Sequence, residues 1–383
     1  MSPSALRILM VSLSRNDPMG GASRVFHLLN EGLLARGHAV TTIHREDLFT
    51  DKEPGRLVGR VALPQVASRA AARLAPERYD VVFSASGMLY PLFGRMGAGK
   101  TLRVHHLLGA AFFDHRATMD EAARGHVAVS STYRTLTGPL PTKWDLAGAR
   151  AADLVTLNCR RDLDYMIDQG IPAERCRWIP LAVHPDLLAA LSAASASPPR
   201  MPRSAIWFGS WSDRKGTAYL VRAWAEVLAR HPDATLTLGG TGMSEAALHA
   251  AFAGMDTSRI RVLGRVSIAE QVAAFERHEL FLFPSLSEGF GLALLEAMAC
   301  GLAAVTTTTG MGGDLIRPEH DALIVPAASA THLASAICRL FDDPALRERI
   351  AAQGRRTAEA YTLERLALAY EETFISYRDK AAR

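Results

Sequence analysis

Residues 281–314 read FLFPSLSEGFGLALLEAMACGLAAVTTTTGMGGD, and this stretch decides the fold. It opens with an apolar run that stops at Pro284 and Ser285, which is typical of a buried parallel strand. A glycine loop follows, and residues 292–300 then have the apolar spacing of a helix that faces a sheet, with Gly301 where a helix would stop. A strand, a glycine loop and a helix in this order present backbone N–H groups and a helix N-terminus to an anion.

Two carboxylates bracket this glycine loop. Glu288 precedes it, and Glu296 lies about two turns into the predicted helix. Because both acids lie where a phosphate would be expected, we predict that they bind something other than the phosphate, such as sugar hydroxyls. The alternative is a capped core helix that carries two exposed glutamates.

The motif EGFGLALLEAMACG resembles the E-x7-E signature of family 4 (glycosyl transferases group 1), a family of retaining nucleotide-sugar glycosyltransferases with the GT-B fold. The preceding Pro-Ser and the trailing Ala-Cys-Gly agree with the family as well. The resemblance implies an α/β protein of two Rossmann-like domains that face a central cleft, with a C-terminal helix that crosses back to the N-terminal domain. It also implies transfer of a sugar from a nucleoside diphosphate to a hydroxyl acceptor, in glycoconjugate or polysaccharide biosynthesis.

Length and composition fit this expectation. A chain of 383 residues exceeds what one hydrophobic core usually serves, so two domains are expected. With 49% apolar and 21% charged residues, the composition is that of an ordinary folded protein, and a net charge of +4 is too small to imply nucleic acid. The short apolar run at Ile8–Leu13 predicts a first strand rather than a signal peptide, so we expect a cytoplasmic protein. Peripheral attachment to the inner face of the cell membrane stays open.

The domain boundaries follow from composition and from the resemblance. Residues 192–204 (SAASASPPRMPRS) lack periodicity and are rich in serine, alanine and proline, which indicates a linker. We therefore predict an N-terminal acceptor-binding domain at 1–190, a linker at 191–204 and a C-terminal nucleotide-sugar-binding domain at 205–360. Residues 361–383 resemble the closing helix of the family, which packs back on the first domain.

The first domain carries two expected contacts. Gly20 and Gly21 lie between a predicted strand and a predicted helix, and in the family such glycines lie close to the donor phosphates and the acceptor. A loop that merely needs a left-handed backbone there is the alternative. His106 is our preferred match to a family histidine at the mouth of the acceptor pocket, with a hydrogen-bonded structural histidine as the alternative.

Arginines recur at four-residue spacing, first as Arg56 and Arg60 and then as Arg69 and Arg73. Such a basic amphipathic face fits contact with an anionic membrane that carries a lipid-linked acceptor. A solvated helix face is the other interpretation. Asp162-Leu163-Asp164 is formally a D-x-D pair, but helix capping explains aspartates at the start of a helix, and we expect no metal site.

The second domain carries the donor contacts that the resemblance implies. Lys215 follows a loop at a helix start, where its ammonium would clamp a diphosphate. Ser210 occupies the position of the family's arginine and brings no charge, so Arg214 or Arg265 would have to compensate. Gly264-Arg265-Val266 matches the segment that clasps the nucleotide base with backbone groups.

The implied catalytic residues are Glu288, Lys215 and His106. Glu288 would accept hydrogen bonds from the donor sugar, and Glu296 from the ribose. The implied donor-binding residues, besides those named above, are Gly289, Phe290, Gly291 and Leu292. No metal and no cofactor are expected, because the UDP- or GDP-linked sugar is itself a substrate; the acceptor would be a sugar, a lipid-linked molecule or a small hydroxyl compound.

Other activities on the same fold remain alternatives. They are a nucleotide-sugar isomerase, a phosphorylase that uses a sugar phosphate, and a protein that binds a nucleotide sugar without catalysis. The replacement of the family's arginine by Ser210 favours the last of these, whereas Glu288, Lys215 and the glycine loop favour the transferase.

Overall fold

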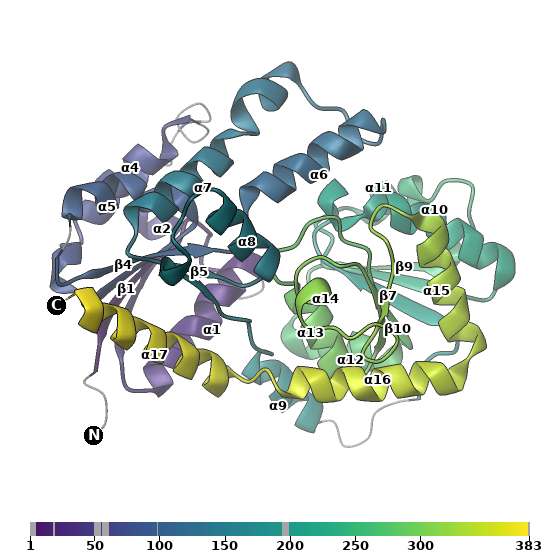
Figure 1. Ribbon diagram of the computed structural model, residues 1–383. Helices are drawn as coiled ribbons and strands as arrows, with labels where there is room; N and C mark the ends of the chain where they lie inside the picture. The colour runs from purple at the N-terminus through teal and green to yellow at the C-terminus, as the bar shows by residue number, and fades with distance from the viewer. Residues whose placement is uncertain are drawn as a thin grey trace. The chain divides into compact units, whose positions relative to one another are not determined.

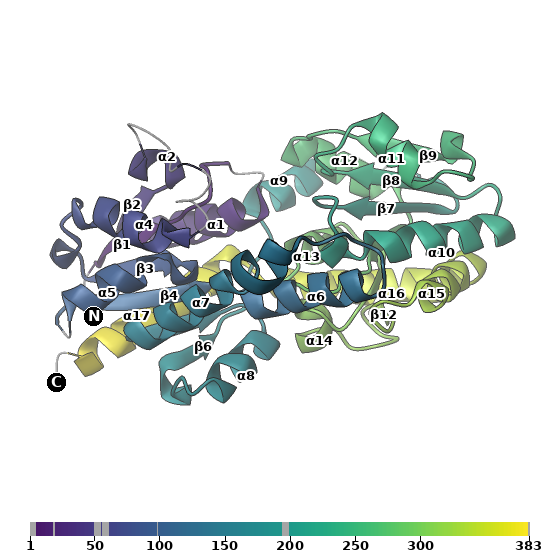
Figure 2. The same ribbon diagram turned by 90° about the horizontal axis from the view of Figure 1, so that it is seen from above.

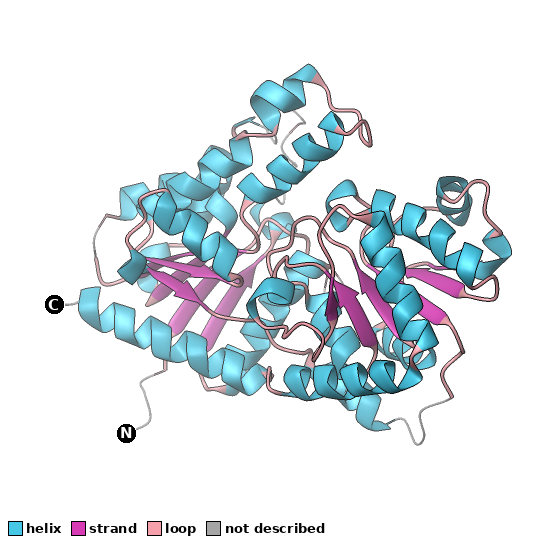
Figure 3. Ribbon diagram, turned by 45° about the vertical axis from the view of Figure 1, so that its right-hand side comes forward, coloured by secondary structure: helices cyan, strands magenta, loops and turns pink. Residues whose placement is uncertain are grey.

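The computed structural model describes residues 5–17, 20–49, 55, 61–97, 99–193 and 199–381. The chain forms two compact units of α/β structure. Each unit is built on a six-stranded sheet whose strands all pair in parallel, and helices cover both faces of each sheet (Figure 3). The α/β class predicted from the sequence is therefore confirmed.

The sheet of the first unit has the strand order β2-β1-β3-β4-β5-β6 (Figure 1). Its strands are β1 (Arg7–Val11), β2 (Ala39–Ile43), β3 (Val81–Ala85), β4 (Leu102–Leu107), β5 (Leu154–Leu157) and β6 (Cys176–Trp178). β1 and β3 are almost wholly buried, as parallel strands covered on both faces must be. The strand order reverses at β1, because β2 pairs with one edge of β1 and β3 pairs with the other edge.

The helices of the first unit connect these strands. They are α1 (Gly21–Ala35), α2 (Arg45–Leu48), α4 (Leu63–Ala72), α5 (Tyr90–Met96), α6 (Ala111–Ala123), α7 (Leu140–Ala151), α8 (Arg160–Asp168) and α17 (Leu363–Ala381). The last helix, α17, packs against α1 and β4 although it ends the chain. Arg36 at the end of α1 pairs with Glu371 of α17, and the ring of Tyr370 is buried beside Phe83 of β3.

The sheet of the second unit has the order β12-β11-β10-β7-β8-β9. Its strands are β7 (Ser204–Phe208), β8 (Thr235–Gly239), β9 (Ile260–Leu263), β10 (Leu280–Phe283), β11 (Ala303–Thr306) and β12 (Leu323–Ile324). Its helices are α9 (Pro185–Ala193), α10 (Thr217–Arg230), α11 (Glu245–Ala251), α12 (Ile268–Arg277), α13 (Leu292–Ala299), α14 (Met311–Asp314), α15 (Ala330–Asp342) and α16 (Pro344–Glu359). α10 and α15 lie side by side, which two views show (Figures 1 and 2).

The boundaries between the two units differ from the boundary at the linker that we predicted. The first unit comprises Met1–Met119, Ala128–Ala182 and Leu363–Arg383, and the second comprises Asp120–Val127 and Val183–Thr362. The division falls before the predicted linker because α9 packs against α12 of the second unit. Asp120–Val127 joins the second unit, where the hydroxyl of Tyr219 on α10 donates a 2.8 Å hydrogen bond to Glu121. Part of the predicted linker, residues 194–198, lies outside the described residues.

Candidate functional site

The candidate site lies at the carboxyl ends of β7 and β10 in the second unit. These strands are neighbours in the sheet, and the connections from them leave in opposite directions, toward β8 and toward β11. Parallel α/β sheets bind ligands at such a switch point, outside the carboxyl ends of the strands. The loop after β7 carries Lys215, and the loop after β10 carries Glu288.

Two glycines allow the loops after β7 and β11 to approach the loop after β10. A Cβ on Gly216 would lie 1.9 Å from the carbonyl oxygen of Pro284, and its φ of +70° also favours glycine. A Cβ on Gly310 would lie 2.3 Å from the carbonyl oxygen of Phe290. The close approach of the three loops after β7, β10 and β11 therefore depends on the absence of side chains at these positions.

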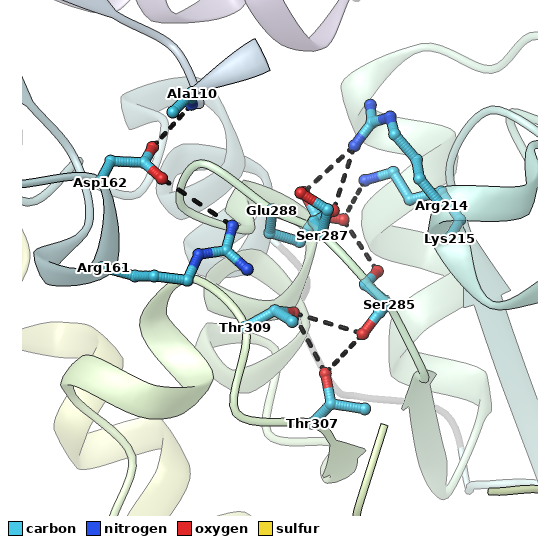
Figure 4. A network of polar contacts seen from close by, with 10 residues as sticks. All are labelled: Ala110, Arg161, Asp162, Arg214, Lys215, Ser285, Ser287, Glu288, Thr307 and Thr309. Atoms are coloured by element: carbon cyan, nitrogen blue, oxygen red, sulfur yellow. Dashed lines mark hydrogen bonds and ion pairs between the residues drawn. The ribbon is translucent and has the colours of Figure 1, made fainter. Parts of the chain in front are cut away.

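Glu288 is buried at the centre of a polar network (Figure 4). Its Oε1 accepts hydrogen bonds from the ammonium of Lys215 and, at 2.8 Å, from the hydroxyl of Ser285. The guanidinium of Arg214 lies 3.9 Å from the other carboxylate oxygen and donates a 3.3 Å hydrogen bond to the carbonyl of Ser287. The structure thus joins the two residues that the sequence singled out for sugar and diphosphate.

The backbone of Ser285 is fixed from the neighbouring strand. Thr307, just after β11, donates a 2.7 Å hydrogen bond to the Ser285 carbonyl, and its hydroxyl lies 3.1 Å from that of Thr309 (Figure 4). This arrangement holds the Ser285 hydroxyl toward Glu288. The carboxylate is therefore oriented by a rigid loop as well as by charge.

Opposing effects act on the Glu288 carboxyl. Burial alone would raise its pKa, but the charges of Lys215 and Arg214, together with hydrogen bonds from Lys215 and Ser285, hold the pKa below its ordinary value. Glu288 is therefore an anion at neutral pH, able to accept hydrogen bonds but unable to donate one. This state suits contact with hydroxyl groups.

Glu296 lies about one turn into α13, which begins at Leu292, and is also buried. Its Oε2 accepts a 2.7 Å hydrogen bond from the side chain of Gln271 on α12. α13 begins after Gly291, whose φ of +100° turns the chain into the helix, and Phe290 and Leu292 flank this turn. The first N–H groups of a helix have no acceptor within the helix, so this end suits an anion.

The other predicted donor contacts differ in exposure. Ser210 is exposed. Arg214, four positions after Ser210 and directly before Lys215, is the arginine that lies beside Glu288. Arg265 is exposed and Val266 half-buried, directly before α12. Of the two arginines expected to compensate for Ser210, the structure thus brings Arg214 to the acidic centre.

Gly20 and Gly21 do not need a left-handed backbone. Gly20 has a φ of −77° and caps α1, and Gly21 is absent from the glycines with positive φ. Among the described residues, a Cβ on Gly21 would meet nothing within 4 Å, and one on Gly20 would make ordinary contacts with Asp17. Among the described residues, neither backbone strain nor internal packing therefore requires glycine at these two positions.

The prediction for His106 needs correction. Its side chain is fully buried, with the ring stacked on Phe83 at 5.0 Å, Nδ1 2.9 Å from the hydroxyl of Thr156, and Tyr370 at its edge. Burial lowers its pKa to about 3, so the ring is neutral. The residue is a core histidine of the first sheet and does not line the mouth of a pocket.

Asp162 caps a different helix from the one that we expected. Its carboxylate accepts a 2.9 Å hydrogen bond from the backbone N–H of Ala110, at the start of α6, rather than from its own helix (Figure 4). Asp145 accepts from the next N–H, that of Ala111, at 3.1 Å. Burial raises the pKa of Asp162 to about 6 and that of Asp145 to about 7.

The structure describes two of the four arginines of the predicted basic face. Arg56 and Arg60 lie outside the described residues, whereas Arg69 on α4 and Arg73, the C-cap residue that follows α4, are exposed. The apolar side of α4, including Leu63 and Ala67, is buried in the core of the first unit. Among the described helices, none combines the length and the apolar character that crossing a bilayer requires.

Sequence reasoning missed several side chains of the site. Ser285 and Thr307 were assigned no role, and Gln271 was treated as part of a helix without function. The hydroxyl of Ser212, in the loop before Lys215, is buried and makes no hydrogen bond among the described residues. Only the proximity of Ser212 to Lys215 in the sequence could have pointed to it.

The amino-acid sequence matches two descriptions of one family. Residues 19–187 match Glycosyltransferase Family 4, and residues 202–343 match Glycosyl transferases group 1. The chain belongs to this glycosyltransferase family. Together the matches span both units, and the second one contains Lys215, Glu288 and Glu296.

Curated relatives of this family member are similar over part of their length. A phosphatidyl-myo-inositol mannosyltransferase of Mycobacterium leprae is 30% identical over 185 residues, 48% of this chain and 49% of the relative. A GDP-mannose-dependent monoacylated alpha-(1-6)-phosphatidylinositol monomannoside mannosyltransferase of Corynebacterium glutamicum is 29% identical over 154 residues, 38% of this chain and 40% of the relative. The chain thus spans about half the length, or less, of these relatives.

Solved structures resemble the glycosyltransferase over almost its whole length. A sucrose-phosphate synthase from Thermosynechococcus elongatus has a TM-score of 0.74 and 19% identity, covering 97% of this chain and 98% of its own. Anabaena Alr3699/HepE, in complex with UDP and glucose, has a TM-score of 0.67 and 18% identity, covering 97% and 100%. At these identities the likeness shows the shared GT-B fold.

Proposed function

We propose that this protein transfers a sugar from a nucleoside diphosphate to a hydroxyl acceptor, with retention of the anomeric configuration. The observation that carries the proposal is the Lys215–Glu288 pair at the switch point of the second sheet, with Glu296 farther along α13. The carboxyl end of the second sheet thereby holds three groups that this reaction needs. They are a cation for the diphosphate, a buried anion for the sugar and a helix N-terminus.

Each part of the site has a role in this reaction. The N–H groups of Phe290, Gly291 and Leu292, together with Lys215, hold the diphosphate, and Gly289 leaves room for its approach. Charge grows on the leaving phosphate oxygens as the glycosidic bond breaks, so donors fixed there lower the barrier. Glu288 holds hydroxyls of the donor sugar.

The nucleoside part is bound next to these groups. Glu296 accepts hydrogen bonds from the ribose, and the backbone of Arg265 and Val266 clasps the base. Arg214 supplies the positive charge that Ser210 lacks, because its guanidinium already lies beside Glu288. Proton transfer from the acceptor to the departing phosphate completes the exchange, and no protein nucleophile is required.

The donor is a UDP- or GDP-linked hexose, and GDP-mannose is the first to test, since two similar relatives carry mannosyltransferase names and one of them is named as GDP-mannose-dependent. For the acceptor we propose a lipid-linked molecule, because the same relatives are named for phosphatidylinositol substrates. The exposed Arg69 and Arg73 fit a peripheral contact with the anionic membrane that holds such a lipid. The loop at Gly20 and Gly21 lets a ligand approach the backbone closely.

A thermal-shift screen of UDP, GDP and their sugars tests the proposal. A bound donor raises the melting temperature by mass action, in proportion to the logarithm of its concentration above Kd. The donor so identified is then offered to phosphatidylinositol, and sugar transfer is followed by mass spectrometry. Stabilisation by no nucleotide at millimolar concentration would overturn the proposal.

A further inference from the structure

Gln271 is a fully buried glutamine that is hydrogen-bonded to Glu296, the candidate ribose-binding acid. Its exposed fraction is 0%, and its Nε2 donates a 2.7 Å hydrogen bond to Oε2 of Glu296. The amide nitrogen of Gln271 is the donor in this bond and therefore faces Glu296. The amide oxygen, Oε1, therefore points elsewhere.

This amide oxygen lacks a donor. Among the residues that the structure describes, no group donates a hydrogen bond to Oε1 of Gln271 although the atom is buried. A buried polar atom without a partner costs about 1–3 kcal/mol. A donor that arrives with a ligand would remove this cost, and such unpaired buried groups are the usual basis of selectivity for one polar substituent.

The surroundings fix Gln271 in place. Ser267, immediately after the proposed base clasp, is the N-cap residue of α12 and forms a capping box with Glu270. Val272 and Phe275 bury the neighbouring positions of the helix in the core. Gln271 thus links the helix that follows the base clasp to the acid on α13, and its side chain cannot turn away without breaking its bond to Glu296.

We propose that Oε1 of Gln271 accepts a hydrogen bond from a ribose hydroxyl of the nucleotide, so that Gln271 and Glu296 together clasp the ribose diol. The inference rests on the proposed function and deepens it, by assigning selectivity for ribonucleotides over their deoxy forms to Gln271. A ribose hydroxyl fits better than a group of the base, because the side-chain amide of Gln271 is hydrogen-bonded to Glu296, the acid that is proposed to bind the ribose. The contact adds to binding and makes no bond to the reacting atoms.

Calorimetry with UDP and GDP, and with their 2′-deoxy and 3′-deoxy forms, tests the inference. In the wild type, removal of the contacted hydroxyl should weaken binding at least about tenfold. Gln271→Leu should weaken binding of the ribonucleotide about tenfold and leave unchanged the affinity for the nucleotide that lacks the contacted hydroxyl. The ratio of these two affinities, which measures the selectivity, should therefore also fall about tenfold. Gln65→Leu, on the exposed side of α4, is the matched control and should bind all of them as the wild type does.

The outcomes separate the inference from the proposed function. If the wild type binds neither UDP nor GDP, the proposed function fails. If the wild type binds one of them and Gln271→Leu keeps the full affinity and selectivity, the inference fails and the proposed function stands. If Gln271→Leu does not fold, which circular dichroism shows, Gln271→Asn gives the same test, because it keeps the amide and shortens its reach.

Discussion

Replacement of Lys215 by methionine separates two roles that the structure allows for this residue. Its ammonium hydrogen-bonds to Glu288 and also lies where the diphosphate is proposed to bind, so its loss could act on the leaving group or only on the orientation of Glu288. Methionine keeps an unbranched side chain that can still cover Phe283, over whose ring the ammonium lies at 5.3 Å. The change therefore removes the charge with little change in packing.

The expected magnitudes differ between the two roles. Loss of one donor to the developing charge costs about 3 kcal/mol in the transition state, or about 100-fold in kcat. In the folded state, Glu288 keeps Ser285 and Arg214 as partners, so the free energy of unfolding should fall by only about 1–3 kcal/mol. The variant should thus remain folded and bind the acceptor normally.

Ser285→Ala is the control, because it removes a hydrogen bond to the same oxygen of Glu288 and leaves the lysine in place. Steady-state release of the nucleoside diphosphate gives kcat for both variants, and thermal unfolding checks that they fold. We expect a loss of about 100-fold for Lys215→Met and less than about tenfold for Ser285→Ala. Equal losses would show that Lys215 acts only by holding Glu288, and a kcat near the wild-type value for Lys215→Met would refute the assignment.

Three further predictions concern the loops and the core. Gly216→Ala should lower the free energy of unfolding by at least about 1 kcal/mol in denaturant titrations, because its φ is +70° and a Cβ would overlap the Pro284 carbonyl; a stable variant would refute the close contact of the two loops. Gly21→Ala should keep the wild-type melting temperature, since a Cβ there meets nothing within 4 Å of the described residues, yet it should slow turnover; unchanged turnover would argue against ligand approach at this loop. The pKa of His106, lowered by burial to about 3, lies below that of the unfolded chain, so its stabilising contribution is present above about pH 6.5 and is lost as the pH falls toward 3. His106→Phe should therefore lose less stability than the wild type between pH 7 and pH 5, and equal losses in urea titrations would contradict this.

The sequence was sufficient for the α/β class, since local periodicity predicts the alternation of strands and helices. The roles of Glu288 and Glu296, which a motif of contiguous residues suggested, stay predictions. It could not show that Lys215 touches Glu288. That contact depends on β10 pairing with β7, a strand far away in the sequence, as well as with β11, and this arrangement is a property of the whole sheet. The family resemblance implied both residues, but not their hydrogen bond.

For His106, the local sequence pattern predicted exposure to a ligand, whereas the fold buries the side chain. Alternation along a strand allows one of two neighbouring histidines to face a ligand, but both faces of β4 are buried in the fold. One cause is α17, whose Tyr370 covers His106 from the far end of the chain. The burial of Gln271 likewise depends on a partner, Glu296, that lies 25 residues away on another helix.

A crystal soaked with UDP or GDP tests the central claim most directly, because electron density locates the diphosphate and the ribose separately. The account predicts the diphosphate at the N-terminus of α13 within hydrogen-bond reach of Lys215, and the ribose hydroxyls against Glu296. A nucleotide bound away from these residues, or one whose ribose does not contact Glu296, would contradict it.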